Sequence, residues 1–138
     1  MIIVVDSNII FSALLSKNSF FLETLLKEEY RFVSPNFLFT EIFKHKEKIL
    51  KHSKLTEPEL LELLNNLFST VQFIPYNFIS AQSLQKAIEL CTGVDMKDVV
   101  FVALSIELNA ALWTGDKTLK DGIAAKGFNQ FFSPKKLE

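Results

Sequence analysis

The sequence predicts an α/β fold in which a short parallel sheet is covered by helices on both of its faces. Short apolar runs typical of buried strands alternate along the chain with longer segments of helical periodicity. Strands that alternate with helices are joined by right-handed crossovers, and such connections produce a parallel sheet. The chain has 138 residues, close to the commonest size of one domain, so we expect a single domain over residues 1–138.

The strands are predicted from short runs of apolar residues. Residues 2–5 are all β-branched and end at Asp6, a pattern typical of a strand buried on both faces. The other predicted strands are residues 31–34, 71–75 and 111–114. A last apolar piece, residues 128–132, is a candidate fifth strand.

The helices are predicted from their periodicity and from the residues at their ends. Residues 8–15 and 19–29 form one broken helix or two, with the interruption near Lys17 and Asn18. Asn77 is expected to cap a later helix.

Two further helix starts have clear capping signals. Ser34 and Pro35 supply a cap and a first-turn proline for a helix that continues to about His52. Thr56 and Glu59 have the spacing of a capping box. The predicted helices from here onward cover residues 35–52, 56–68, 78–91, 98–108 and 117–127.

Composition and charge exclude several classes of protein. With 49% hydrophobic residues and few glycines and prolines, the chain is globular. A net charge of −1 excludes a uniformly basic surface but leaves a local basic patch open. The single cysteine, Cys91, lies in an apolar helical segment and is expected to be a packed thiol. The first apolar run is too short for a signal peptide or membrane span, so we expect a soluble cytoplasmic protein.

Four acidic residues are predicted to meet at one edge of the sheet. Asp6 follows the first strand, and Asp116 comes just after the strand at 111–114. The carboxyl ends of parallel strands share one edge, where functional sites gather. Glu41 interrupts the apolar face of its predicted helix, and Asp98 lies in the first turn of its own, on the inward face.

Three of the aspartates also have a purely structural interpretation. Asp95 and Asp116 could be helix N-caps, since aspartate is favoured there. Asp98 could be placed in a first turn because a negative charge interacts well with the helix dipole. The sequence leaves these alternatives open.

The other two acidic positions differ in how easily structure alone explains them. Glu41 could pair with Lys44 or His45 on its own helix. Asp6 is harder to explain, because a carboxylate at the end of a buried strand is costly unless it is hydrogen-bonded, paired or metal-bound. The only arginine in the chain, Arg31, offers little scope for such pairing.

A cluster of carboxylates suits a divalent cation. Like charges held close together raise one another's pKa, and a cation neutralises them. A site made only of oxygen ligands selects Mg²⁺ or Mn²⁺ over Zn²⁺. In-line hydrolysis of a phosphodiester is the chemistry that such a site supports.

The segments that carry these acids resemble a known family. They are IIVVDSNIIFSALL at the start, SPNFLFTEIFK around Glu41, and DMKDVVFVALSIELNAALWTGDKTL over residues 95–119. They are similar to the PIN-domain nucleases, which include VapC-type toxins of bacterial toxin–antitoxin pairs. The resemblance covers essentially the whole chain and implies a three-layer α/β/α sandwich that cleaves single-stranded or structured RNA with a metal ion.

The same resemblance implies roles for individual residues. The residues that would hold catalytic Mg²⁺ or Mn²⁺ are Asp6, Glu41, Asp98 and Asp116. The residues that would orient these carboxylates and bound water are Ser7, Asn8, Asp95 and Thr114. Ser7 stands where the family often has threonine, and it keeps the hydroxyl group.

A basic segment next to Glu41 is a candidate RNA contact. Residues 44–54 hold five lysines and two histidines, and a solvated helix end is an equally open interpretation. His45 is a minor candidate for a metal ligand or general base. The lysines predicted to contact RNA phosphates are Lys44, Lys46, Lys48, Lys51 and Lys117.

Our hypothesis from the sequence is therefore a metal-dependent endoribonuclease, with a toxin of a toxin–antitoxin pair as its possible biological form. Its expected partners are RNA, a small antitoxin protein and a second copy of the chain. The phenylalanine-rich residues 18–26 and 37–39 are either core or part of such a protein interface. The alternative is a catalytically inactive PIN-fold module that binds RNA or protein.

Overall fold

A parallel sheet forms the centre of the molecule, which is described here from a computed structural model covering residues 1–15 and 20–134. The strands are β1 (Ile2–Val5), β2 (Arg31–Pro35), β3 (Val71–Ile74) and β4 (Ala111–Trp113). They are hydrogen-bonded in the order β3-β2-β1-β4, and every pair is parallel. Because β1 lies between β2 and β4, its carboxyl end is central to that edge of the sheet.

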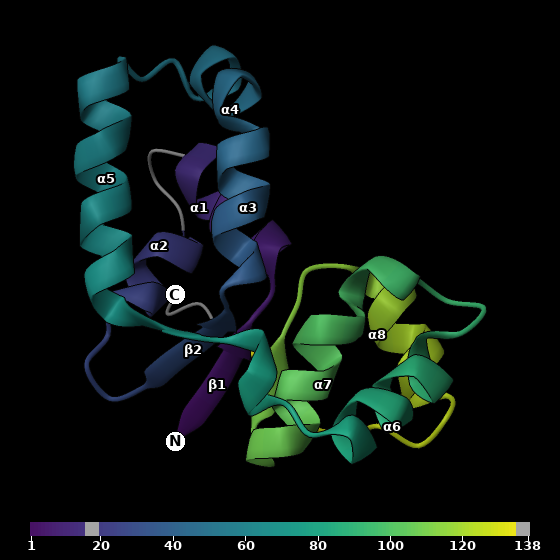
Figure 1. The fold of residues 1–138 in the computed structure, drawn as a ribbon. Coiled ribbons are helices and arrows are strands. Elements are labelled where there is room, and N and C mark those ends of the chain that lie inside the picture. The colour runs from purple at the N-terminus through teal and green to yellow at the C-terminus, as the bar shows by residue number, and fades with distance from the viewer. Residues whose placement is uncertain (16–19, 135–138) are drawn as a thin grey trace.

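Helices cover both faces of this sheet (Figure 1). The first face carries α1 (Ser7–Leu15), α2 (Phe20–Leu25), α3 (Phe37–Lys44), α4 (Lys46–Ser53) and α5 (Glu57–Thr70). The second carries α6 (Ala81–Cys91), α7 (Val99–Leu108) and α8 (Lys117–Ala124). Short 3₁₀ turns, η1 (Tyr76–Phe78) and η2 (Met96–Asp98), precede α6 and α7. The predicted α/β/α architecture is confirmed.

Alternating side chains of the strands pack into two separate hydrophobic cores, one on each face of the sheet. Ile3 and Val5 of β1 pack with the α1–α5 layer, whereas Val4 packs with the α6–α8 layer. Both faces of a central strand are thus buried, which explains why its sequence is a continuous β-branched run. α7 is apolar almost all round because it lies in the second core, with Phe101 and Leu104 at most 1% exposed.

The predicted helix over residues 35–52 is wrong at its start and in its middle. Ser34 and Pro35 belong to β2, where Pro35 pairs with Ile74 of β3, so strand pairing outweighs the local capping signal. α3 therefore begins at Phe37, and the helix is interrupted at His45 before α4 starts.

Of the two other predicted helix caps, one is confirmed and one is wrong. Thr56 and Glu59 form the predicted capping box through reciprocal bonds of 3.0 and 3.3 Å. Asn77 does not cap α6; Ser80 does, with its hydroxyl accepting the Ser83 N–H at 3.1 Å. The interruption predicted near Lys17 and Asn18 falls outside the described residues.

The candidate fifth strand over residues 128–132 is reduced to one bridge. Phe131 makes a single parallel bridge with Leu112 of β4. This piece therefore passes along the edge of the sheet without extending it as a regular strand. Among the helices of the described ranges, none is long and apolar enough to cross a membrane.

Candidate active site

Asp6 lies directly after β1 at the carboxyl edge of the sheet and is fully buried. Its Oδ2 accepts a hydrogen bond of 2.7 Å from the Thr114 hydroxyl and a longer one of 3.4 Å from the Asn8 amide. Its Oδ1 accepts one of 3.4 Å from the Ser7 hydroxyl. Burial raises the pKa of Asp6. Hydrogen bonds from the Thr114 hydroxyl, from the backbone N–H groups of Ser7 and Asn8 and from the Ser7 hydroxyl partly offset this rise.

Asn8 and Thr114 join the ends of β1 and β4 around this carboxylate. The Asn8 Oδ1 accepts the backbone N–H of Gly115 at 2.9 Å. A Cβ atom at Gly115 would lie 3.4 Å from that oxygen, so a residue without a side chain suits this close approach. The Thr114 hydroxyl also accepts the N–H of Asp116 at 3.1 Å, which orients the chain as it enters α8.

Three aspartates form a tight cluster beside Asp6. One carboxylate oxygen from each of Asp95, Asp98 and Asp116 lies within 4.8 Å of the other two. Asp95 accepts the Lys97 N–H at 3.0 Å, and Asp116 caps α8 by accepting the Leu119 N–H at 3.1 Å. The structural interpretation of Asp95 and Asp116 as caps is therefore correct, yet both also face the cluster.

Electrostatics sets Asp98 apart. Burial, together with the negative charges of Asp6, Asp95 and Asp116, raises the pKa of Asp98 from 3.8 to about 8. The crowding thus opposes ionisation of Asp98 unless a positive charge compensates for it. An oxygen-only donor set with this excess of negative charge fits a hard divalent cation such as Mg²⁺ or Mn²⁺.

Glu41 is linked to Asp6 through Ser7. The Ser7 hydroxyl is 3.4 Å from the Glu41 Oε1 and also 3.4 Å from the Asp6 Oδ1, so it bridges the two carboxylates. Glu41 forms no ion pair with Lys44 or His45, which are both within the described residues. His45 instead packs edge-on against Phe11, with ring centroids 5.8 Å apart.

A family model described as PIN domain matches residues 4–132 of the chain. The chain belongs to the PIN-domain family. A solved structure supports the fold of this PIN domain: a chain of VapBC2 from Rickettsia felis, in a crystal structure with a DNA fragment from their promoter, has a TM-score of 0.64. It shares 19% identity, and the match covers 88% of this chain and 92% of that chain. A comparison with curated proteins finds no significant match.

The structure brings the predicted site residues of this PIN domain together with one change of emphasis. Asp95, predicted as a supporting residue, lies inside the tight cluster with Asp98 and Asp116. Two predicted ligands, Asp6 and Glu41, lie outside it. The 3₁₀ turn η2 lies between Asp95 and Asp98 and brings both carboxylates close to Asp116. Their spacing in the sequence is therefore the feature that indicates a shared site. The contact between Gly115 and Asn8 was not foreseen, although a glycine beside an acidic site was a visible cue.

The predicted RNA-contacting lysines lie in both helical layers. Lys44 ends α3, and the others of the basic segment follow on α4, which leads away from the sheet (Figure 1). Lys46 pairs with Glu57 at 3.3 Å and is therefore partly neutralised. Lys117 is exposed at the first position of α8, next to Asp116.

Cys91 is separate from this chemistry. Its side chain is buried at the end of α6, and burial, with the charges of Asp98 and Asp95, raises the pKa of the thiol to about 11. A thiol with such a pKa is protonated at neutral pH and is a poor nucleophile. This agrees with the predicted role as a packed thiol.

Proposed function

We propose that this PIN domain is a metal-dependent endoribonuclease. The observation that carries the proposal is the convergence of Asp95, Asp98 and Asp116 beside the buried Asp6 at the carboxyl edge of the sheet. The mutual repulsion in this group, expressed in the raised pKa of Asp98, favours binding of a divalent cation.

The proposed cation is Mg²⁺ or Mn²⁺, held principally by Asp6, Asp98 and Asp116 with Glu41 beside them. When bound, such an ion supplies the Lewis acidity for in-line hydrolysis of a phosphodiester. Asp95, within the same cluster, is an additional ligand or supports the others. The expected products carry a 5′ phosphate and a 3′ hydroxyl.

The protein's own groups hold this arrangement in place before any ligand binds. Thr114 and Asn8 fix the Asp6 carboxylate, and Ser7 couples it to Glu41. Preorganised ligands of this kind raise both metal affinity and rate, because little reorganisation remains to be done. Lys117 and the exposed lysines of α3 and α4 are proposed to bind RNA phosphates.

The test is cleavage of single-stranded RNA by purified protein with Mn²⁺ or Mg²⁺ and with a chelator. Cleavage should require the cation and should fall by about 100-fold or more in Asp6→Asn and Asp98→Asn. Asp121→Asn, an exposed aspartate on α8, is the matched control and should cleave normally. A folded wild-type protein that binds RNA without cleaving it would support the inactive binding module instead.

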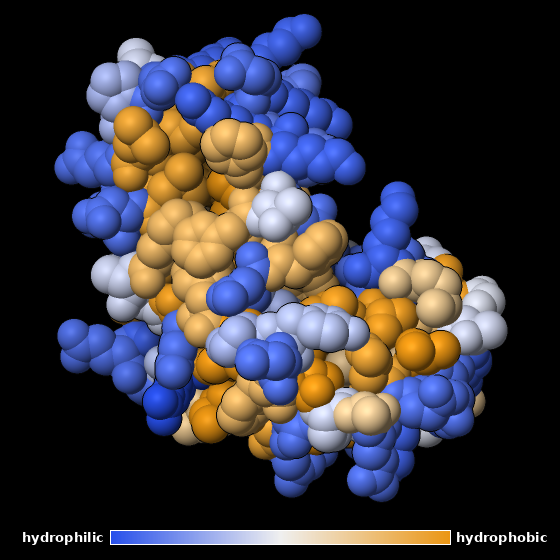
Figure 2. Space-filling view, in the orientation of Figure 1, coloured by the Kyte–Doolittle hydropathy of each residue, from blue (hydrophilic) through white to orange (hydrophobic). Residues whose placement is uncertain are grey.

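A protein partner is part of the proposal. An apolar groove of about 740 Å³ lies between α3 and α5, lined by aromatic and leucine side chains. Figure 2 shows this apolar surface over α3 and α5, and Phe43 and Leu61 within it are 84% and 57% exposed. Contiguous exposed apolar surface marks protein contact sites, so we propose that a small antitoxin or a second copy of the chain covers it.

A further inference from the structure

Helix α8 contacts the segment that carries Asp95 and Asp98 at two points away from the carboxylates. α8 begins at Asp116, whose carboxylate is fixed to the helix by its bond to the Leu119 N–H. Asp95 is likewise fixed to its own segment by the Lys97 N–H. The distance between the two carboxylates therefore depends on how α8 packs against residues 92–98.

The first contact is between Gly122 and Val94. A Cβ atom on Gly122 would lie 2.5 Å from Val94 Cγ1 and 2.7 Å from Val94 Cγ2, closer than carbon atoms can approach. Only a glycine therefore allows α8 to pack so near to the residue that directly precedes Asp95. Glycine also lowers the intrinsic stability of a helix interior by about 1 kcal/mol relative to alanine. The close packing against Val94 compensates for this loss of helix stability.

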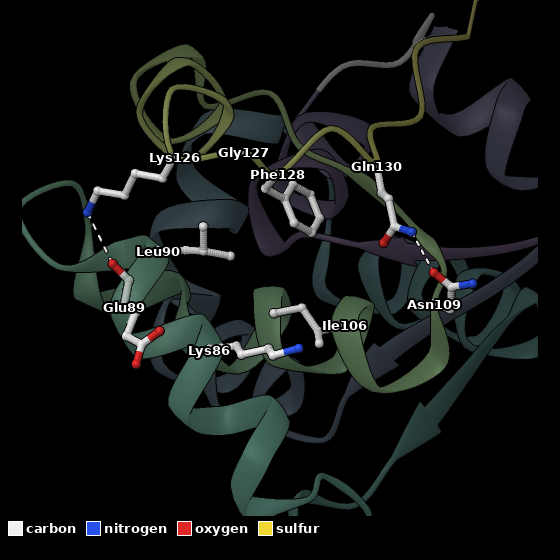
Figure 3. Close-up of a pocket in the computed structure, with 9 residues that line it drawn as sticks. All are labelled: Lys86, Glu89, Leu90, Ile106, Asn109, Lys126, Gly127, Phe128 and Gln130. Atoms are coloured by element: carbon white, nitrogen blue, oxygen red, sulfur yellow. Dashed lines mark hydrogen bonds between the residues drawn. The ribbon is translucent and has the colours of Figure 1, made fainter.

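The second contact is made by Lys126, in the turn that follows α8. Its ammonium group donates hydrogen bonds to the backbone carbonyl of Glu89, at 3.1 Å, and to that of Thr92. Figure 3 shows the Lys126 side chain reaching from this turn to the Glu89 carbonyl. Both carbonyls belong to the last turn and C-cap of α6, where a cation also interacts favourably with the helix dipole.

We propose that Gly122 and Lys126 are positioning residues that hold residues 92–98 against α8 and so set the separation of Asp95 and Asp98 from Asp116. Neither residue touches a cation or substrate in this proposal; both act through the segment between α6 and α7. The proposal deepens the metal-binding function proposed above and rests on it for its consequence in cation affinity. The packing itself does not depend on that function.

The first experiment measures Mn²⁺ affinity by calorimetry in folded variants. Gly122→Ala should weaken binding by about 10- to 100-fold, because its new methyl group pushes Val94 and Asp95 away from α8. Val94→Ala removes the two methyl groups that would collide and should bind nearly as the wild type does. The double variant should recover most of the affinity. A structural effect alone would lower the melting temperature without this recovery.

The second experiment needs no cation and follows backbone amide exchange by NMR. Lys126→Met should speed exchange of the Thr92 and Asp95 amides, which bond to carbonyls of α6, by about tenfold or more. Lys126→Arg, which keeps the cation, should restore slow exchange. The Leu60 amide in α5 serves as the internal control, since it lies in the other helical layer.

The outcomes separate this proposal from the proposed function. A wild-type protein that binds no Mn²⁺ contradicts the proposed function, and amide exchange still decides whether α8 holds the segment. A wild-type protein that binds Mn²⁺, together with unchanged affinity in Gly122→Ala, overturns the positioning role. Unchanged exchange in Lys126→Met overturns the part assigned to Lys126.

Discussion

The two helical layers of this PIN domain differ in how closely they pack and in how much apolar surface they expose. The α6–α8 layer packs closely, with glycine-to-valine contact and a lysine tied to backbone carbonyls, and it supplies Asp95, Asp98 and Asp116. The α1–α5 layer supplies Ser7, Asn8 and Glu41 to the site and leaves Phe43 largely exposed in its groove. The comparison shows that one layer carries the tight cluster of aspartates, whereas the other leaves an apolar groove exposed.

The largest effect on stability is expected in the core of the α6–α8 layer. Leu104 in α7 is fully buried, so Leu104→Ala should lower the free energy of unfolding by about 2–5 kcal/mol through lost burial and a cavity. Leu61→Ala, in the exposed groove of the other layer, should change it by less than about 1 kcal/mol. Chemical denaturation measures both. Equal losses in the two variants would contradict the contrast between the layers.

A smaller loss of stability is expected when the hydrogen bond from Thr114 to Asp6 is removed. Thr114→Val removes the 2.7 Å donor to this buried carboxylate and should cost about 1–3 kcal/mol. It should also raise the pKa of Asp6 further, because the lost bond favours the charged form. Thr118→Val on the exposed side of α8 is the control in denaturant titrations. A Thr114 variant as stable as this control would show that the bond contributes little.

The acidic cluster predicts a dependence of stability on pH. Between pH 3.8 and about 8 the folded protein retains a proton on Asp98 that the unfolded chain releases, so raising the pH favours unfolding. The melting temperature of the cation-free protein should therefore fall over this range and level off above it. Asp98→Asn should flatten this profile, and added Mn²⁺ should oppose the fall in the wild type. A flat wild-type profile would argue against crowding of the carboxylates.

The smallest effect on stability is expected in the groove between α3 and α5. Phe43→Ser should change the free energy of unfolding by less than about 0.5 kcal/mol, because the side chain is 84% exposed. It should nevertheless reduce self-association or antitoxin binding, measured by light scattering and by pull-down of the candidate antitoxin. If the variant and the wild type behave identically in both assays, the groove is not the binding site of a protein partner.

The sequence was most informative where one physical effect dominates. The β-branched run of β1 and the Thr56 capping box were predicted correctly because burial and local hydrogen bonding both favour the observed structure. The position of Asp6 at the sheet edge followed from the order of strands and helices. The roles of the site residues remain predictions, and the variants of Asp6, Asp98 and Thr114 test three of them.

The sequence was less informative where distant segments compete with local signals. Pro35 has the local features of a helix start, but pairing with Ile74, far along the chain, keeps it in β2. The separation of Asp95 and Asp98 from Asp116 depends on how α8 packs against the segment before α7. Periodicity within one helix contains no information about such packing.

The strand order has a consequence for synthesis on the ribosome. β1 is made first, but its neighbour β4 and the Thr114 hydroxyl that fixes Asp6 come more than one hundred residues later. A nascent chain that has not yet extended past Asp116 lacks a complete set of carboxylates. The acidic cluster can therefore form only after translation has passed Asp116.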